Sequence, residues 1–492
     1  IKKAGYEAII INNNPETVST DFDISDKLYF DPLYIDDVMN VINEEKIDGV
    51  IVQFGGQTAL NLSKKLNDRG VNLLGTSFES IDLAEDREKF RVLLKKLDIN
   101  SPIGGSVTSL EEAYKLVSEI GYPVIVRPSY VIGGRAMKVV YNPEELERYL
   151  KEAVNLSREH PVLVDKYILG REIEVDAISD GQDLIIPGIM EHVERTGVHS
   201  GDSIAIYPAS DLPKKVCKKI EEYTVNIARE LNVKGLLNVQ YAFDGDKIYV
   251  IEVNPRASRT VPILSKVTDV PMVEIAVEVM LGKKIKEFNY RQDMYKYSNI
   301  FAVKMPVFSS KKLPGVDVAL GPEMKSTGEV LGVDFDRDKA IYKAFKAAGI
   351  EILRKGNLYV CINDRDKCSS LGIIKKYASL NFNIIASSGT FKFLNENGIK
   401  CSRLSIEDAI SCIKEDKIDI VINIPTQGYD STREGFKLRH TALAHDKVVF
   451  TCIDTASVYA DAILVDKEGV AVEYRPMSEY LQGSLNKKII NI

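Results

Sequence analysis

The residues best suited to chemistry lie in residues 236–261, where two apolar segments rich in β-branched and aromatic side chains are joined by an Asp-Gly-Asp-Lys turn. Side chains alternate between the faces of a strand, so Glu252 and Asn254 share one face. Asn238 and Gln240 share a face of the preceding strand for the same reason. Carboxylate and amide oxygens are hard ligands, which Mg²⁺ prefers while it also holds nucleotide phosphates. The pattern predicts a metal and nucleotide site on a β-hairpin.

Two arginines follow the hairpin directly. Arg256 and Arg259 carry planar, forked cations that suit phosphate or carboxylate groups. The hairpin alone fits a simpler interpretation equally well, in which the amides are ordinary edge-strand residues and Glu252 caps a turn. The remainder of the chain favours the metal site.

The metal site requires a particular pairing of the two strands. Directly opposed residues of an antiparallel pair point to the same face, so Gln240 must lie opposite Glu252. We therefore predict a turn with an odd number of residues around Gly245 and Asp246.

A glycine-containing loop between two strands is a second candidate. Arg127 and Arg135 enclose Ser129, Gly133 and Gly134, and successive backbone N–H groups in such a loop can hold phosphate oxygens. The spacing is neither that of a Walker A loop nor that of a dinucleotide-binding loop. The alternative is a glycine hairpin with incidental arginines.

Acidic residues and a histidine complete the candidates. Glu172, Glu174 and Asp176 alternate on one strand face, and like charges at that spacing need water, cations or a ligand beside them. His199, next to Ser-Gly-Asp, is the best candidate for proton handling. A loop histidine that only makes hydrogen bonds is the alternative.

Alternating strands and helices are expected to position these residues. Strands expected at 8–13, 49–54 and 71–75, with helices between them, predict an open parallel sheet. Such sheets bind ligands after the carboxyl ends of their strands, where residues 12–17 and 53–58 lie.

A second alternation from about Gly356 predicts a separate small parallel-sheet domain. Ser387, Ser388 and Thr390 lie at a predicted helix N-terminus, which favours an anion site, although helix capping by Thr390 fits as well. We expect this tail to tune activity, and its removal after about Lys355 to leave the preceding chemistry intact.

Length and composition limit the class of protein. With 492 residues, 45% of them hydrophobic, the chain is long enough for three or four soluble domains. A net charge of −7 argues against a nucleic-acid groove. Six cysteines without a CxxC pair fit a reducing, cytoplasmic compartment, and apolar runs stay short of the roughly 18 residues of a membrane helix. Because the chain opens with Ile1 rather than Met, we expect a longer polypeptide.

Six segments together carry a family resemblance. They are NNNPETVSTD (12–21), QFGGQT (53–58), RPSYVIGGRAM (127–137), HSGDS (199–203), EVNPR (252–256) and LGPEMKSTGE (320–329). In combination they resemble the large chain of carbamoyl-phosphate synthase, most closely its C-terminal synthetase half. The tail from about Gly356 resembles the family's methylglyoxal-synthase-like regulatory domain.

The resemblance implies an α/β protein with an ATP-grasp fold. Residues 1–83 would form a pre-ATP-grasp open parallel sheet without its opening strand, and residues 84–285 the ATP-grasp domain. Residues 286–355 would complete the synthetase unit and link it to the tail. Residues 356–492 would form a methylglyoxal-synthase-like, Rossmann-type allosteric domain.

The implied activity is phosphorylation of carbamate by MgATP, giving carbamoyl phosphate and ADP for pyrimidine or arginine biosynthesis. The metal ligands implied by the motifs are Gln240, Glu252 and Asn254. The implied nucleotide-binding residues are Arg87, Arg127, Ser129, Gly133, Gly134, Lys166, Glu172, Gly201, Gln240 and Glu252. The residues implied at the reacting groups are His199, Arg256 and Arg259. The expected allosteric residues are Ser387, Ser388, Thr390 and Asn423.

The resemblance also implies cofactors and partners. Mg²⁺ or Mn²⁺, with K⁺ as a further ion, would accompany ATP and carbamate. An N-terminal synthetase half on the same or a separate chain, a glutamine amidotransferase subunit or domain, and a small-molecule effector would be partners, without nucleic acid or membrane. The tail departs from the family where Cys401 leads almost directly into a helix, so the effector stays open.

Two alternative functions share part of this sequence pattern. Another ATP-grasp carboxylate–amine ligase or a biotin-dependent carboxylase would share the hairpin and the glycine loop, but such enzymes lack the NNNPET and GPEMKSTG motifs. A nucleotide-binding regulatory module without catalysis belongs to a different class, and the intact set of Gln240, Glu252, Asn254 and His199 argues against it.

Overall fold

The computed structural model describes residues 1–128, 137–156, 162–290, 299–309, 317–425, 433–469 and 471–486. The chain folds into two compact units, each assembled from segments that are distant in sequence. The first unit contains residues 1–101, 173–189 and 210–297. The second contains residues 102–172, 190–209 and 298–492. No helix in the described ranges is long and apolar enough to cross a membrane.

The beginning of the first unit is less regular than the sequence pattern suggests. Strands β1 (Ile9–Ile11) and β2 (Lys27–Tyr29) pair in parallel. The strands expected at 49–54 and 71–75 meet in a single parallel bridge between Val50 and Leu73. The helix expected between these two segments is divided into two short helices. The helices here are α1 (Ile35–Glu45), α2 (Gly56–Leu60), α3 (Ser63–Asn67), α4 (Phe78–Glu85) and α5 (Arg87–Lys96).

The predicted hairpin forms the centre of the first unit. Strands β11 (Lys234–Phe243) and β12 (Ile248–Asn254) pair antiparallel. Strand β7 (Arg171–Asp180) lies next to β11, and β8 (Leu184–Ile185) pairs with β7. The nearby helices are α8 (Lys214–Glu230), α9 (Val261–Thr268) and α10 (Met272–Met280). The alternating apolar side chains of β11, almost all buried, pack against α8 and α10 and fix the hairpin in place.

The second unit begins with a small antiparallel sheet. Its strands lie in the order β3 (Gly104–Val107), β6 (Val162–Lys166), β4 (Val124–Pro128) and β5 (Lys138–Val140). Helices α6 (Leu110–Ile120) and α7 (Pro143–Leu156) pack on this sheet. A buried cluster that includes Val124, Val126 and Val164 forms its core.

A second antiparallel group of strands follows in the same unit. It contains β9 (Ile189–Arg195), β10 (Ala205–Tyr207), β13 (Phe301–Val307) and β14 (Gly328–Asp334). Helix α11 (Arg337–Ala347) packs against β13 and β14. Gly332 permits this approach, because a Cβ at that position would come within 2.2 Å of the Ala340 carbonyl oxygen.

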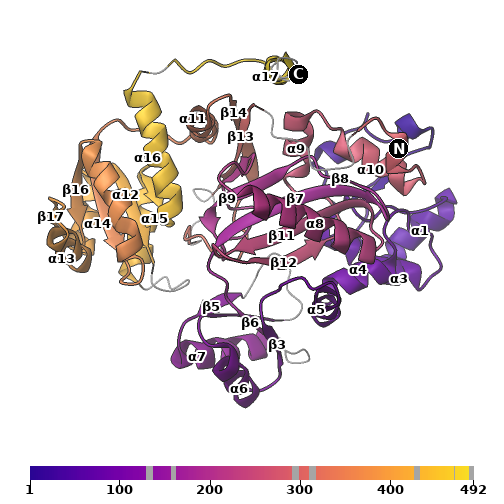
Figure 1. Ribbon diagram of the computed structural model, residues 1–492, viewed down its shortest axis with the longest axis horizontal. Coiled ribbons are helices and arrows are strands. Elements are labelled where there is room, and N and C mark those ends of the chain that lie inside the picture. Colours follow the sequence, from indigo (N-terminus) through magenta and orange to yellow (C-terminus); the bar gives the residue numbers. More distant parts are fainter. Residues whose placement is uncertain are drawn as a thin grey trace. The chain divides into compact units, whose positions relative to one another are not determined.

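The tail confirms the predicted parallel sheet. The strands lie in the order β17 (Ser402–Arg403), β16 (Phe382–Ala386), β15 (Gly356–Ile362), β18 (Ile420–Ile424) and β19 (Val448–Phe450), all parallel. The helices of the tail are α12 (Lys367–Ser379), α13 (Ser388–Glu396), α14 (Ile406–Lys414), α15 (Glu434–Ala444), α16 (Ile453–Lys467) and α17 (Met477–Asn486). Figure 1 shows α12, α14 and α16 beside this sheet.

The tail shares a core with the strands that precede it. Helix α16 packs against α11, where the rings of Phe345 and Tyr459 lie 5.2 Å apart at 78°. The Tyr459 hydroxyl donates to the Glu351 carbonyl at 2.7 Å. Truncation after Lys355 would therefore open a buried apolar cluster, so point variants are the better test of the tail.

Candidate functional site

The hairpin confirms the predicted pairing of Gln240 with Glu252. The register shifts by one residue immediately beyond this pair, so that Tyr241 lies opposite Val250. Ile251 is therefore the extra residue of a β-bulge. Because directly opposed residues point to the same face, an amide and a carboxylate stand side by side on the hairpin.

The predicted turn of odd length is wrong. Gly245 and Asp246 form a two-residue turn, closed by a hydrogen bond from the Asp244 amide to the Lys247 carbonyl at 3.2 Å. Gly245 has a φ of +103°, which glycine adopts without strain. The Asp244 carboxylate also accepts hydrogen bonds from the amides of Asp246 and Lys247. The one-residue shift that aligns the metal-ligand candidates comes from the bulge and not from the turn.

Arg87 holds the bulge. It is the first residue of α5, whose N-terminus is capped by the Asp86 carboxylate. Arg87 Nη1 donates to the carbonyl oxygen of the bulged Ile251 at 2.7 Å, and Nη2 lies 3.7 Å from Glu252 Oε2. The predicted nucleotide-binding arginine is thus fixed beside the carboxylate of the candidate metal site.

The donor set fits a hard cation if the Asn254 amide rotates. Its Nδ2 donates to Glu252 Oε1 at 3.1 Å, and its Oδ1 accepts from Arg256 Nη2 at 3.3 Å. Glu252 presents carboxylate oxygens and Gln240 carries an amide oxygen on the same face, whereas Asn254 would have to rotate its amide before its oxygen could face Glu252. In the described ranges, three or more His, Cys, Asp or Glu side chains are nowhere gathered for a metal ion, so a cation here would need amide, phosphate or water oxygens as well.

The two arginines after the hairpin occupy a well-anchored loop. Arg256 Nη1 donates to the Ala257 carbonyl at 3.1 Å. Its Nε is buried and has no hydrogen-bond partner among the residues that the structure describes. Arg259 is half-buried and lies between Ser258 and Thr260 in sequence. A buried guanidinium donor without a partner is suited to an anion.

Hydrogen bonds from Asn238 and two hydroxyls stabilise two of the three aligned acids, Glu174 and Asp176. Asn238 Nδ2 donates to Glu174 Oε1 at 2.8 Å and to Asp176 Oδ1 at 3.0 Å. The hydroxyls of Ser258 and Thr260 donate to Asp176 Oδ2. Burial, and then the neighbouring charge of Glu174, raise the pKa of the Asp176 carboxyl, while these hydrogen bonds oppose the shift. The sequence predicts water, cations or a ligand beside these acids, whereas the partners seen in the structure are a side-chain amide and two hydroxyls.

The predicted nucleotide-binding residues of the second unit lie close to one another in its small sheet. Arg127 Nη2 donates to Asp165 Oδ2 at 3.2 Å. Lys166 Nζ donates to the carbonyls of Gly121 and Tyr122 at 3.2 and 2.8 Å. The paired strands β4 and β6 therefore hold both cations. The remaining loop candidates, Ser129, Gly133 and Gly134, lie outside the described residues.

Glu172 lies at the start of β7 and is almost fully buried. Its Oε1 is 3.5 Å from His192 Nδ1, and His192 is buried as well. A histidine on a neighbouring element was not selected from the sequence, because the tertiary contact that makes it relevant leaves no local pattern.

His199 is held in one tautomer by its own loop. Its Nδ1 accepts a hydrogen bond from the Gly201 amide at 3.0 Å, so the imidazole proton resides on Nε2. The backbone amide of His199 donates to the Gly321 carbonyl at 2.8 Å. The loop thus presents the Nε2–H donor of His199. Its orientation is fixed by one hydrogen bond to the imidazole and one from the backbone amide.

A neighbouring acid fastens the same loop to the GPEMKSTG segment. Asp202 is buried, and its carboxylate accepts hydrogen bonds from the amides of Lys325 and Ser326 at 2.8 to 3.1 Å. Burial lowers the pKa of the Lys325 amine, and the charges of Asp317 and Asp202 oppose that shift. The motif that carried part of the resemblance therefore supports the His199 loop.

Three of the tail candidates, Ser387, Ser388 and Thr390, lie at the N-terminus of α13, but Thr390 is not a cap. Its hydroxyl accepts from the Ile362 amide at 3.0 Å and from the Ser387 hydroxyl at 3.1 Å. Ser387 is the N-cap residue and makes no side-chain capping bond. The capping alternative for Thr390 is wrong, and its buried hydroxyl ties α13 to β15.

Two cations beside α13 were not selected from the sequence. Arg403 Nε donates to Ser388 Oγ at 3.1 Å, and Lys367 Nζ donates to the Gly389 carbonyl at 3.0 Å. In sequence they resemble solvated surface charges, and only the packing of β17 and α12 places them here. Together with the helix N-terminus they favour an anion.

The structure brings part of the predicted site together directly. The first unit joins Arg87, Glu252, Asn254 and Arg256 through hydrogen bonds and an ion pair, with Gln240 opposite Glu252. Arg127, Lys166, Glu172, His199 and Gly201 belong to the second unit.

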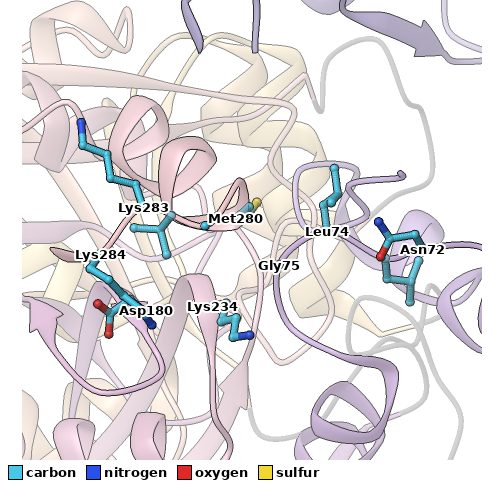
Figure 2. A pocket seen from close by; sticks show the side chains of 11 residues that line it. Asn72, Leu74, Gly75, Asp180, Lys234, Met280, Lys283 and Lys284 are labelled. Carbon is cyan, nitrogen blue, oxygen red and sulfur yellow. The ribbon is translucent and has the colours of Figure 1, made fainter. Parts of the chain in front are cut away.

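A cavity of about 310 Å³ lies elsewhere in the first unit (Figure 2). Its lining includes Lys234, Lys284, Met280 and Asp180, and none of the predicted site residues. The Asp180 carboxylate is engaged by backbone, because it accepts hydrogen bonds from the nearby amides of Gln182 and Asp183 and from the distant amide of Ile285. The cavity is therefore separate from the hairpin site.

Comparison with protein families agrees with the resemblance. Residues 1–83 match the carbamoyl phosphate synthase preATP-grasp domain. Residues 86–288 match the carbamoyl-phosphate synthase L chain, ATP binding domain. Residues 370–451 match the MGS-like domain.

Solved structures share the fold at low sequence identity. A biotin carboxylase from Campylobacter jejuni, solved as a complex with β,γ-ATP, gives a TM-score of 0.58 at 20% identity and covers 70% of this chain and 86% of its own. The biotin carboxylase domain of a Hydrogenobacter thermophilus 2-oxoglutarate carboxylase, in complex with MgADP, ADP and bicarbonate, gives 0.58 at 21% identity, with 70% and 85% covered. At this identity the likeness shows the ATP-grasp fold alone.

A much closer relative is the carbamoyl phosphate synthase large chain of Clostridium acetobutylicum, which is 61% identical over 483 residues. The match covers 98% of this chain and 45% of that protein, so the chain spans a little under half of the relative's length. With both of its synthetase segments matched and this identity sustained along nearly its whole length, the chain belongs to the family of carbamoyl phosphate synthase large chains.

Proposed function

We propose that the chain phosphorylates carbamate with ATP and so produces carbamoyl phosphate and ADP. The observation that carries this proposal is the pairing of Gln240 with Glu252, held by Arg87 on one side and continued by Arg256 on the other. In this reaction an anionic acceptor must approach a polyanionic donor, so their negative charges must be neutralised. A carboxylate and amides that can bind a metal ion, next to arginine cations, suit this task.

Gln240 and Glu252, with Asn254 after amide rotation, would hold Mg²⁺ or Mn²⁺. Such an ion supplies charge neutralisation for the nucleotide phosphates. Arg87 is already held at the bulge, so its side chain would lose little conformational entropy on binding the phosphates. K⁺ is part of the proposal as an additional ion.

The remaining residues bind and orient. Arg256 and Arg259 would hold the carbamate or carbamoyl end, since the buried Nε of Arg256 lacks a partner among the described residues. His199 would donate from Nε2 to an oxygen of the transferring group. Transfer to an oxygen anion needs no covalent nucleophile, so positioning and electrostatic stabilisation suffice.

Arg127, Lys166 and Glu172 would bind the nucleotide, together with Ser129, Gly133, Gly134 and Gly201. The hydrogen bonds of Arg127 and Lys166 place both cations on adjacent strands of one small sheet. The H. thermophilus domain of the same fold is described in complex with MgADP and bicarbonate, which supports nucleotide binding by this fold.

The tail would act as a regulatory domain. Ser387, Ser388, Thr390 and Asn423 would form an anion site for a small phosphorylated effector, supported by Arg403 beside Ser388. We further propose a cytoplasmic enzyme of pyrimidine or arginine biosynthesis, which works with an N-terminal synthetase half and a glutamine amidotransferase subunit or domain.

The reverse reaction tests the proposal. The purified protein should make ATP from ADP and carbamoyl phosphate with Mg²⁺, and it should need neither bicarbonate, glutamine nor biotin. Absence of ATP formation, measured while calorimetry still shows ADP binding, would reject the enzyme and favour a non-catalytic regulatory module. A requirement for biotin would favour a carboxylase.

A further inference from the structure

The loop of residues 255–260 connects β12 to α9 and carries both arginines of the candidate anion site. A loop of this length is ordinarily mobile, and an arginine side chain adds further freedom. Here the residues on either side of each arginine are held, through backbone or hydroxyl groups, by a buried polar residue from a distant part of the same unit. These two residues are Gln53 and Asp176.

Gln53 fixes both neighbours of Arg256. The Gln53 side chain is fully buried, and its Nε2 donates to the Pro255 carbonyl at 2.7 Å. Its main-chain carbonyl accepts from the Ala257 amide at 3.0 Å. The same Nε2 lies 3.1 Å from the hydroxyl of Thr76, which holds the amide in this orientation.

Asp176 fixes both neighbours of Arg259. Its Oδ2 accepts from Ser258 Oγ at 2.8 Å and from Thr260 Oγ1. The Thr260 amide donates to Ser258 Oγ at 3.1 Å, so the turn is closed through the same hydroxyl. Asp176 and Thr260 are each 1% exposed, which excludes direct contact of this carboxylate with a substrate in the structure.

Asp176 is also linked to the candidate metal ligands. Asn238 Nδ2 donates to Asp176 Oδ1, and Asn238 Oδ1 accepts from Asn254 Nδ2 at 3.4 Å. Asn254 in turn contacts Glu252 and Arg256. One buried carboxylate therefore orients the arginine loop and the end of the hairpin together.

We propose that Gln53 and Asp176 are positioning residues, which hold the 255–260 loop so that Arg256 and Arg259 meet the anionic substrate without reorganisation. The inference rests on the proposed function for the identity of that anion. Its physical basis is preorganisation, since cations fixed before binding lose less entropy and stabilise developing charge more effectively.

The test removes single donors to Asp176 and, in a separate variant, changes Asp176 itself. Ser258→Ala and Thr260→Val each delete one hydroxyl, and Asp176→Asn weakens all three contacts. Ser265→Ala and Thr268→Val are matched controls, because these hydroxyls bond carbonyls within α9. In the reverse reaction, kcat/KM for carbamoyl phosphate should fall by about 10- to 100-fold in the loop variants. In the loop variants the KM for ADP should change by less than about twofold. In the two control variants kcat/KM for carbamoyl phosphate should also change by less than about twofold.

Hydrogen exchange provides a readout that does not depend on activity. The amides of Ala257 and Thr260 should exchange at least about tenfold faster in Ser258→Ala and Thr260→Val than in the controls, while the amides of β11 keep their protection. Unchanged exchange, or loop variants kinetically equal to the controls, would overturn the inference. If the wild-type protein forms no ATP, the proposed function fails and the exchange rates alone decide whether the loop is held in this way.

Discussion

Arg439 donates from Nε and Nη2 to the two carboxylate oxygens of Asp317, and both side chains are about 95% buried. Its Nη1 donates to Oδ1 of Asn423, one of the proposed effector residues. A few residues beyond Asp317, the carbonyl of Gly321 accepts from the amide of His199. The segment that begins at Asp317 therefore touches the proposed regulatory site and the proposed catalytic loop.

Removal of one partner of the Asp317–Arg439 ion pair should lower the stability of the folded tail. In Asp317→Asn the buried guanidinium of Arg439 loses its compensating charge. The free energy of unfolding of the tail should therefore fall by about 3–5 kcal/mol. Urea unfolding, with hydrogen exchange of α15 to identify the transition, measures the change. The double variant Asp317→Leu with Arg439→Met should recover most of the stability, because no unpaired charge remains.

The surface variant Glu147→Gln is a control for the Asp317 prediction, since its partner Lys151 is exposed and should tolerate the change. A double variant no more stable than Asp317→Asn would show that the pair does not act through charge compensation.

Glu252→Gln tests the hairpin site. The substitution keeps the shape of the side chain and removes its charge, so the rate of ATP formation should fall by about 10²–10³, which corresponds to roughly 3–4 kcal/mol of transition-state stabilisation. The Mg²⁺ concentration at half-maximal rate should rise as well. Glu230→Gln, on the surface of the same unit, is the matched control. An unchanged rate in Glu252→Gln would reject the metal-site assignment.

The hairpin shows why part of this site could be predicted from sequence and part could not. The shared face of Gln240 and Glu252 follows from the period of two in a strand, which is a local property. The bulge at Ile251 depends on Arg87, 164 residues earlier, and no local pattern contains that contact. The turn prediction failed because it assigned the register shift to the only irregular segment visible in sequence.

The same distinction holds for the fold. The tail was predicted well because its short buried strands alternate with helices, and each signal is local. Strands β13 and β14 were missed, since Lys304 and Pro306 interrupt one apolar run and Gly332 the other. Lys304 is buried there because its amine reaches the Ser200 carbonyl, and Gly332 is required by the close approach of α11. Gln53 was noticed only within a motif, because its contacts with Pro255 and Ala257 are tertiary.

His199→Asn should separate catalysis from nucleotide binding. The variant loses the Nε2 donor proposed for the transferring group, so kcat of the reverse reaction should fall at least about tenfold. The dissociation constant for ADP, measured by calorimetry, should change by less than about threefold. An effect on ADP affinity as large as that on kcat would contradict the proposed place of His199.

Arg403→Glu should abolish the response to phosphorylated effectors. The substitution places an acidic group beside Ser388 at the N-terminus of α13, where it repels an anion and forms no part of the proposed catalytic site. Basal ATP formation should remain within about twofold of wild type. Lys400→Glu, on the neighbouring surface, controls for the change in net charge. A full effector response in Arg403→Glu would place the regulatory site elsewhere.

The stability of the first unit should depend on the charge of Glu174. Burial and that charge raise the pKa of the folded Asp176 carboxyl above the ordinary value of about 3.9. At pH values between the unfolded and the folded pKa, Asp176 is protonated in the folded protein and ionised in the unfolded chain. The free energy of unfolding therefore falls as the pH rises from about 4 through the raised folded pKa.

Glu174→Gln keeps an acceptor for Asn238 and removes the repulsion. The folded pKa of Asp176 should drop, and the loss of stability toward high pH should shrink. Measured by urea unfolding, the difference between variant and wild type should therefore favour the variant more at pH 8 than at pH 5. A difference independent of pH would mean that Glu174 does not carry its charge beside Asp176.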